Sequence, residues 1–167
     1  MRRLLTAALA GALILAGGGT AQTTFPRPSY PPTTPKFVPK FAVIGETKLI
    51  MEGLAHANYR SVSKLLKTKP ADNDTWVFAR GQAVLIAETG NLLLLRPPRN
   101  EGRDTWMKLA MSMRSQATLL AKAAGARDYV ASRVELGKLT TACNNCHATF
   151  RIPVKVAPEG EASQRDL

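Results

Sequence analysis

Cysteine and histidine are scarce in this sequence, with two of each among 167 residues, and aromatic residues make up only 6% of the chain. A structural zinc site takes about four Cys or His ligands, so zinc would have to use every cysteine and histidine present. Two cysteines are also too few for the network of disulfides that stabilises many small exported proteins. The fold must therefore rest on a hydrophobic core, and 45% of the residues are hydrophobic.

Acidic residues are also scarce, because 12 Asp and Glu stand against 23 Lys and Arg, which gives a formal net charge of +11 at pH 7. The sequence has no dense Lys/Arg tract with interleaved aromatics, so nucleic acid is not the expected partner. Acidic proteins, an anionic membrane surface or an anionic cofactor fit better, although a basic surface can also serve solubility alone. We find no acid–base pair, catalytic triad or phosphate-binding glycine loop, and we do not expect an enzyme.

The apolar run near the start of the chain, Leu4–Ala16, is too short for a comfortable transmembrane span. Two arginines precede this run, and the small residues behind it end in a candidate cleavage site at residues 19–21. That order is typical of a secretory signal peptide, with an uncleaved anchor as the competing interpretation. We therefore expect residues 1–21 to be removed and the protein to be periplasmic or otherwise exported.

Proline is concentrated in one segment, because six of the eleven prolines lie between residues 25 and 40. Each proline fixes φ and removes an amide donor, so this segment cannot be a helix or a central strand. We predict a semi-rigid, polyproline-II-like extension over residues 22–42. A recognition role for this extension is the alternative to that of a linker.

Runs of alternating β-branched residues are absent, and apolar residues recur at helical spacing after the proline-rich segment. Four helices are predicted, separated by the segment TKPADND, by Pro97 and by Gly125, and ended by Pro153. Helices of roughly four to seven turns with short connections predict an all-α fold, namely an antiparallel four-helix bundle. The bundle is expected over residues 43–153, with residues 154–167 as a C-terminal tail.

The same pattern predicts where these helices begin, end and face the core. The first helix is predicted to begin at Val43 and to carry Ile44 on its buried stripe. Gly125 is predicted as the left-handed residue that follows the third helix. The fourth helix is predicted to include Val130 and Val134 in its apolar pattern.

Both cysteines and one histidine lie in the last predicted helix, in the sequence Cys143-Asn144-Asn145-Cys146-His147. A thioredoxin-like dithiol would need a strand before it and a helix starting at it, and a disulfide here would close a tiny loop that adds little stability. Cys-x-x-Cys-His is also the attachment motif of c-type haem, in which two thiols bond the vinyl groups and the histidine ligates the iron. We predict one covalent haem c, bound by Cys143 and Cys146, with His147 as the proximal iron ligand.

The stretch CNNCHATFR extends this motif by Phe150 and Arg151. On a four-helix chain it resembles the ending of the class II c-type cytochromes, which comprise cytochrome c′ and its methionine-ligated, low-spin relatives. The resemblance covers roughly residues 43–153, and outside the fourth helix it rests on pattern and spacing, including the position of Trp106. It implies that the distal residue comes from the first helix. A methionine there implies a six-coordinate electron carrier, and an apolar residue implies an open site for gases.

Met51 is the candidate distal ligand, because it lies nineteen positions before Pro70, at a spacing similar to that of the low-spin relatives. The alternative is that Met51 only fills the core. His56 is a further candidate, but five residues span about 140° of an α-helix, so His56 and Met51 would not both face the iron. The methionines of the third helix are expected in the core or at its edge, namely Met107, Met111 and Met113.

Lys48 and Arg151 are the candidate contacts for the haem propionates, although Lys48 can equally be a solvated lysine. The leading functional prediction is outer-sphere transfer of single electrons, with His147 and Met51 on the iron. A five-coordinate protein that binds NO or CO is the alternative, and a helical interaction protein with a structural haem is a third. The expected partners are redox proteins with acidic surfaces, and the resemblance leaves a homodimer open.

Overall fold

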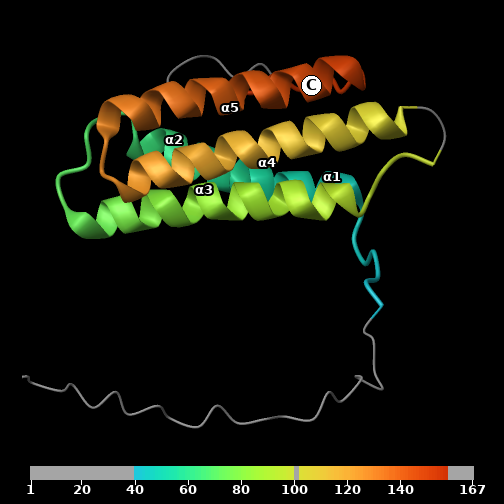
Figure 1. Cartoon of the computed structure of the whole chain (residues 1–167), viewed down its shortest axis with the longest axis horizontal. Helices are drawn as coiled ribbons and strands as arrows, with labels where there is room; N and C mark the ends of the chain where they lie inside the picture. Colours follow the sequence, from blue (N-terminus) through green and yellow to red (C-terminus); the bar gives the residue numbers. More distant parts are fainter. Residues whose placement is uncertain (1–39, 100–101, 158–167) are drawn as a thin grey trace, which may run out of the picture. The chain divides into compact units, whose positions relative to one another are not determined.

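The computed structural model describes residues 40–99 and 102–157, and its regular elements in that part of the chain are helices. The predicted signal peptide lies outside the described residues, as do most of the proline-rich extension and of the C-terminal tail. Four helical stretches pack side by side, which confirms the predicted all-α bundle (Figure 1). Within the described residues, no helix is both long and apolar enough to cross a membrane.

The first helical stretch consists of three consecutive elements, and each of the other three is a single α-helix. The elements follow one another as α1 (Thr47–Ile50), η1 (Met51–His56), α2 (Ala57–Leu65), α3 (Asn73–Leu94), α4 (Arg103–Gly125) and α5 (Tyr129–Thr149). The most extensive packing joins α3 to α4 and α4 to α5, and α2 lies against α3. Because short connections join the four helical stretches, consecutive stretches run antiparallel.

The first stretch departs from the predicted helix in two ways. It begins at Thr47 rather than Val43, because Glu46 has extended backbone angles, φ −64° and ψ 147°. Ile44 therefore lies before the helix and is 90% exposed, so its prediction as a buried residue is wrong. The element η1 is a π-helix, in which hydrogen bonds span five residues instead of four. Such π-helical turns are frequent at functional sites.

Left-handed arginines follow both α4 and α5, at a position where glycine is the usual residue. Arg127 has φ 56° and Arg151 has φ 53°. After α4, the N–H of Arg127 donates to the Ala124 carbonyl at 3.0 Å, as in a Schellman turn. The predicted end of this helix near Gly125 is confirmed, but Gly125 is not the left-handed residue, because it is still helical and the reversal occurs two residues later, at Arg127.

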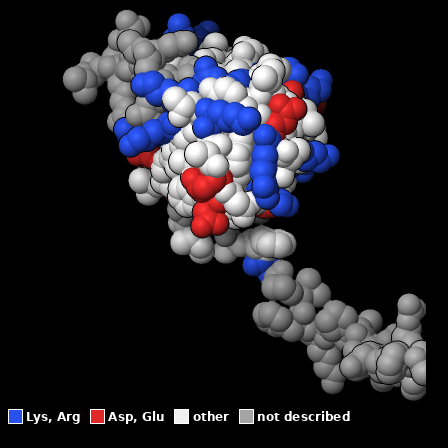
Figure 2. Space-filling model, turned by 90° about the vertical axis from the view of Figure 1, so that its left-hand side faces the viewer, with Lys and Arg blue, Asp and Glu red and all other residues white. Residues whose placement is uncertain are grey.

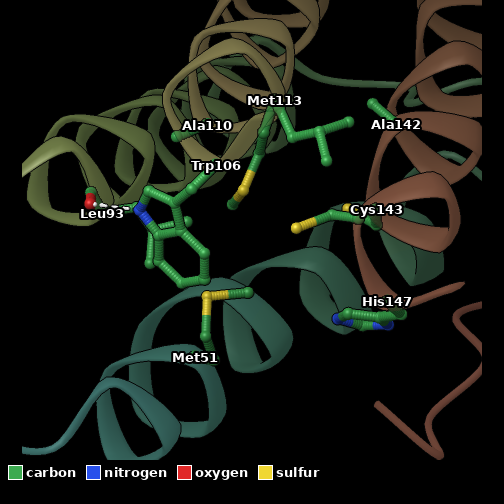
Figure 3. Close-up of a pocket in the computed structure, with 10 residues that line it drawn as sticks. Met51, Leu93, Trp106, Ala110, Met113, Ala142, Cys143 and His147 are labelled. Carbon is green, nitrogen blue, oxygen red and sulfur yellow. Dashed lines mark hydrogen bonds between the residues drawn. The ribbon is translucent and has the colours of Figure 1, made fainter. Parts of the chain in front are cut away.

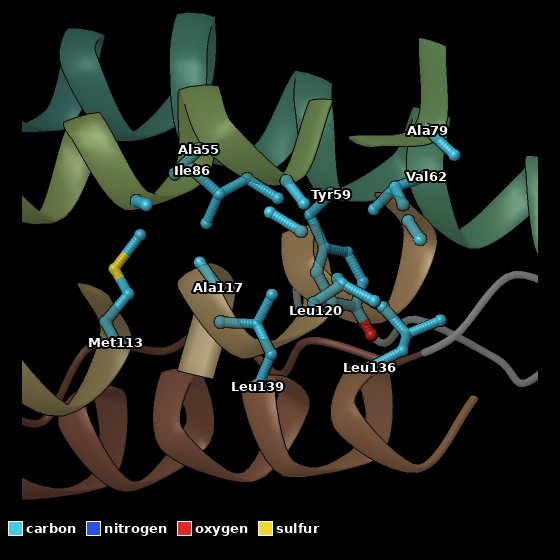
Figure 4. Close-up of a cluster of buried hydrophobic side chains, with 14 of the residues drawn as sticks. Ala55, Tyr59, Val62, Ala79, Ile86, Met113, Ala117, Leu120, Leu136 and Leu139 are labelled. Carbon is cyan, nitrogen blue, oxygen red and sulfur yellow. The ribbon is translucent and has the colours of Figure 1, made fainter. Parts of the chain in front are cut away.

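Small side chains let α3 and α4 approach each other closely. The buried alanines of these two helices are Ala79, Ala83, Ala87, Ala110, Ala117, Ala121 and Ala124. The approach is tightest at Gly90, where an added Cβ would lie 2.8 Å from the Cβ of Arg114. Larger apolar side chains such as Ile86, Leu120 and Leu139 fill the centre of the bundle (Figure 4). The α3–α4 pair thus forms the close-packed part of the core.

Two valines of α5 lie on its solvent side rather than in the core. Val130 is 73% exposed and Val134 is 49% exposed, so their inclusion in the apolar pattern is wrong. Leu136 and Leu139 are 1% and 0% exposed and occupy the inward face instead. This face is the one that continues, at helical spacing, into the cysteines of the motif.

Basic side chains are spread over the molecular surface, in keeping with the net charge of +11. Figure 2 looks onto the end of the bundle where α3 and α5 begin, and Lys and Arg outnumber Asp and Glu on this face. The exposed basic residues of the helix ends and loops here include Lys64, Lys67, Lys69, Lys122 and Arg127.

Candidate functional site

A pocket lies at the end of the bundle where α5 ends and α4 begins (Figure 3). Its lining residues, from η1, α3, α4 and α5, are Met51, Leu93, Trp106, Leu109, Ala110, Met113, Ala142, Cys143, Cys146 and His147. The empty space around these side chains is about 330 Å³, a value that includes open solvent at the mouth. The pocket therefore brings together the four residues that the sequence predicted to bind haem or its iron, namely both cysteines, His147 and Met51.

The two thiols of the motif lie three residues apart on α5, on one face of the helix. Both cysteines are free and partly buried. Burial, and secondarily the charge of Cys146, raises the pKa of the Cys143 thiol to about 12, and burial also raises the pKa of Cys146. Both thiols therefore stay protonated near neutral pH, whereas a catalytic dithiol depends on a lowered thiol pKa. The electrostatics argue against a thioredoxin-like redox pair.

The imidazole of His147 is oriented by a backbone carbonyl. Its Nδ1 lies 2.8 Å from the carbonyl oxygen of Val154, in the segment that follows α5. Because a carbonyl oxygen only accepts hydrogen bonds, Nδ1 carries the ring proton and Nε2 of the neutral ring keeps a lone pair. Metal-ligating histidines are commonly held in this way, with the other ring N–H on a carbonyl or carboxylate. In this tautomer the lone pair of His147 is on Nε2, the nitrogen that does not face Val154.

Trp106 forms a wall of the pocket where three helices end or begin. Its indole Nε1 donates to the Leu93 carbonyl at 2.8 Å, which satisfies one of the last carbonyls of α3. The indole also meets the Phe150 ring edge to face, with centroids 5.3 Å apart and planes at 71°. Gly102 precedes α4 at φ 85°, and a Cβ there would lie 3.4 Å from the Phe150 ring. These contacts fix the ends of α3, α4 and α5 around the pocket.

Two methionine side chains line the pocket, one from η1 and one from α4 (Figure 3). Met51 is the first residue of η1 and is half-buried. Met113 is 4% exposed, which confirms the expectation of a core residue, but its place at the pocket was not predicted. Met113 lies seven residues, or about two helical turns, after Trp106, so this spacing could have placed both on one face. The pocket therefore holds a second thioether besides Met51.

The other candidate residues, His56, Lys48 and Arg151, are not part of the lining that the described chain gives this pocket. The predicted separation of about 140° around the helix between Met51 and His56 assumed a regular α-helix. These residues are instead the first and last of a π-helical turn, in which residues five apart lie on successive turns, so this prediction is wrong. Lys48 and Arg151 are exposed. Their assignment as propionate contacts remains a prediction.

Zinc has too few ligands at this site. Among residues 40–99 and 102–157, no group of three or more His, Cys, Asp or Glu residues could hold a metal ion. Haem iron needs less from the protein, because the porphyrin supplies four nitrogens and the chain only one or two axial atoms. Two thiols on one helix face, an imidazole lone pair and a thioether are a donor set that fits haem c.

In comparisons with known proteins, no protein-family model and no curated protein matches the chain. The resemblance to class II cytochromes therefore rests on the motif and the helical pattern. The function has to be argued from the chemistry of the pocket.

Proposed function

We propose that this protein is an exported c-type cytochrome of the class II kind, which binds one haem through Cys143 and Cys146 and carries single electrons. The observation that carries the proposal is the state of His147, whose Nδ1 is bonded to the Val154 carbonyl at 2.8 Å. This bond leaves Nε2 as a metal ligand beside a pocket that both thiols and Met51 also line.

Each side chain at the pocket has a distinct role in this proposal. The thiols of Cys143 and Cys146 would hold the haem covalently, as thioethers to its two vinyl groups. His147 would ligate the iron from α5. Haem, when bound, supplies the one-electron iron couple. Trp106 and the apolar lining exclude water, which favours ligation by neutral nitrogen and sulfur atoms.

Met51 decides which activity follows, because it approaches the pocket from η1, across from the motif on α5 (Figure 3). A thioether ligand favours reduced iron and raises the reduction potential. If His147 and Met51 both stay on the iron, the rearrangement on electron transfer would be small, which suits an outer-sphere carrier. The basic surface would attract redox partners with acidic surfaces.

A five-coordinate protein that binds NO or CO is the second candidate, and one observation favours it. Met51 is only half-buried, and the neighbouring lining from α3 and α4, including Leu93, Leu109 and Ala110, is apolar. If Met51 packs against these side chains without ligating, an open coordination position would admit a small neutral gas.

Absorption spectroscopy of the full chain, produced in a host that attaches haem c, tests both the covalent binding of haem and the electron-carrier function. Haem that stays with the polypeptide through denaturing acid extraction supports covalent binding, and haem that is extracted refutes it. A low-spin spectrum of the reduced protein that CO leaves unchanged supports the electron carrier. A high-spin spectrum with rapid and complete CO binding would instead establish the gas-binding alternative.

A further inference from the structure

Asn144, the first of the two residues between the cysteines, is hydrogen-bonded to the chain that follows α5. Its Nδ2 donates to the carbonyl oxygen of Val156 at 2.8 Å, and its Oδ1 accepts from the N–H of Val156 at 2.8 Å. One side-chain amide thus satisfies both backbone groups of a residue twelve positions away. Asn145, the second residue between the cysteines, is exposed. The two asparagines of the motif therefore have different environments.

The chain reaches Val156 through a tight reversal. Arg151 adopts a left-handed φ of 53°, and the N–H of Ile152 donates to the His147 carbonyl at 2.8 Å, as in a Schellman turn. Residues 152–156, which we name the return segment, then pass back along α5. Val156 at its end packs against the hydrophobic core.

The hydrogen bond to His147 lies between the two anchors of the return segment. The Schellman turn fixes one end of the segment, and Asn144 fixes the other end at Val156. Between these anchors, the Val154 carbonyl meets Nδ1 of His147 at 2.8 Å. One hydrogen bond contributes less net free energy than the conformational entropy that is lost when several residues become ordered. The bond to His147 therefore depends on the anchors that order the segment.

We propose that Asn144 is a positioning residue, which clamps the return segment to α5 and thereby holds the Val154 carbonyl on Nδ1 of His147. The clamp fixes the tautomer and the orientation of the ring, so that Nε2 is the nitrogen offered to a metal. Its effect on iron rests on the proposed function. A fixed acceptor on Nδ1 makes the imidazole a stronger electron donor, which favours ferric iron and lowers the reduction potential.

Three variants of the full chain test the clamp. Asn144→Leu removes both bonds to Val156 while keeping the branched shape of the side chain. Asn145→Leu is the matched control, because it makes the same change at the exposed neighbour. Asn144→Asp keeps the acceptor for the Val156 N–H and loses the donor to the Val156 carbonyl. If Asn144→Leu folds poorly, Asn144→Asp still tests the loss of one of the two bonds.

Each variant is measured in three ways in its reduced form. Amide hydrogen exchange at Val156 is expected to accelerate roughly tenfold or more in Asn144→Leu, less in Asn144→Asp, and not in Asn145→Leu. The ¹⁵N signal of His147 Nδ1 is expected to move in the same order, because its hydrogen-bond acceptor changes from a fixed carbonyl to water. The reduction potential is expected to rise in Asn144→Leu and to stay unchanged in Asn145→Leu, and Asn144→Asp is left out of this comparison because its added negative charge would itself lower the potential.

Equal exchange rates in Asn144→Leu and Asn145→Leu would overturn the proposal. Faster exchange with an unchanged His147 signal would overturn it too, because Asn144 would then hold the segment without positioning the ring. A wild-type chain without covalent haem would refute the proposed function instead. In that case, exchange at Val156 and the His147 signal in the same samples still decide whether the clamp exists.

Discussion

The two ends of the bundle are built from similar parts but are filled differently. Each has a tryptophan near the start of a helix, Trp76 of α3 at one end and Trp106 of α4 at the other. Trp76 is 4% exposed within the core, whereas Trp106 is half-buried and lines the pocket. We name the end around Trp76 the closed end and the end around Trp106 the pocket end.

At the closed end, the side chains of the bundle satisfy and cover neighbouring groups. The Tyr129 hydroxyl donates to the Lys67 carbonyl at 3.1 Å, and Arg133 donates to the Leu66 carbonyl at 3.4 Å, so α5 caps the chain that leaves α2. Leu66 itself is 0% exposed. At the pocket end, thiols, an imidazole and thioethers surround a shared space instead. The comparison teaches that the closed end is filled by its own side chains, while the pocket end leaves sulfur and nitrogen atoms around a space that they do not fill.

The largest expected effect comes from removing the thiols of the pocket end. In Cys143→Ser combined with Cys146→Ser, we expect complete loss of covalent haem, because no thioether can form. The bundle should still fold, since both cysteines are free and neither belongs to a disulfide. Haem content after denaturing extraction and far-ultraviolet circular dichroism measure the two outcomes. Asn145→Ser is the control on the same turn, and haem that remains covalently bound to the double variant would contradict the assignment.

The next effect distinguishes the two methionines of the pocket end. Met51→Leu is expected to convert a low-spin iron to high-spin and to allow rapid CO binding, because leucine has no atom that can ligate. Met113→Leu makes the same change of similar volume on α4 and is expected to leave the spectrum low-spin. The absorption spectrum before and after addition of CO measures both. A spin change in Met113→Leu alone would assign the ligand to Met113, and no change in either would exclude both of these methionines as the ligand.

How much could be predicted from the sequence also differs along the molecule. Helical spacing predicted the bundle and placed both cysteines and His147 on one element, since local periodicity determines which residues share a helix face. The π-helical turn that begins at Met51 was not predicted, because the apolar pattern of the first helix was interpreted with the α-helical period of 3.6 residues throughout. The clamp between Asn144 and Val156 was also unpredictable. It depends on a reversal at Arg151, and arginine is a residue type that rarely adopts a positive φ.

Substitutions at two glycines of α3 are expected to change the free energy of unfolding by smaller amounts and in opposite directions. Gly90→Ala, near the pocket end, is expected to destabilise the protein by about 1–3 kcal/mol, because its Cβ would lie 2.8 Å from the Cβ of Arg114. Gly81→Ala, nearer the closed end, is expected to stabilise it by about 0.5–1 kcal/mol, since nothing lies within 4 Å and alanine favours the helix. Urea unfolding measures both. Equal effects would show that the approach of α3 to α4 at Gly90 is not tight.

The smallest effect compares the left-handed arginines that follow α4 at the closed end and α5 at the pocket end. Arg127→Gly and Arg151→Gly are each expected to raise the free energy of unfolding by about 0.5–1 kcal/mol, because glycine adopts a positive φ without steric cost. The reduction potential of the haem-loaded protein should change in Arg151→Gly alone if Arg151 contacts a propionate, since the loss of a nearby positive charge lowers the potential. Equal gains in stability with no change of potential in either variant would make Arg151 a turn residue only. The assignment of Arg151 to the propionates would then be wrong, while its role in reversing the chain toward His147 would stand.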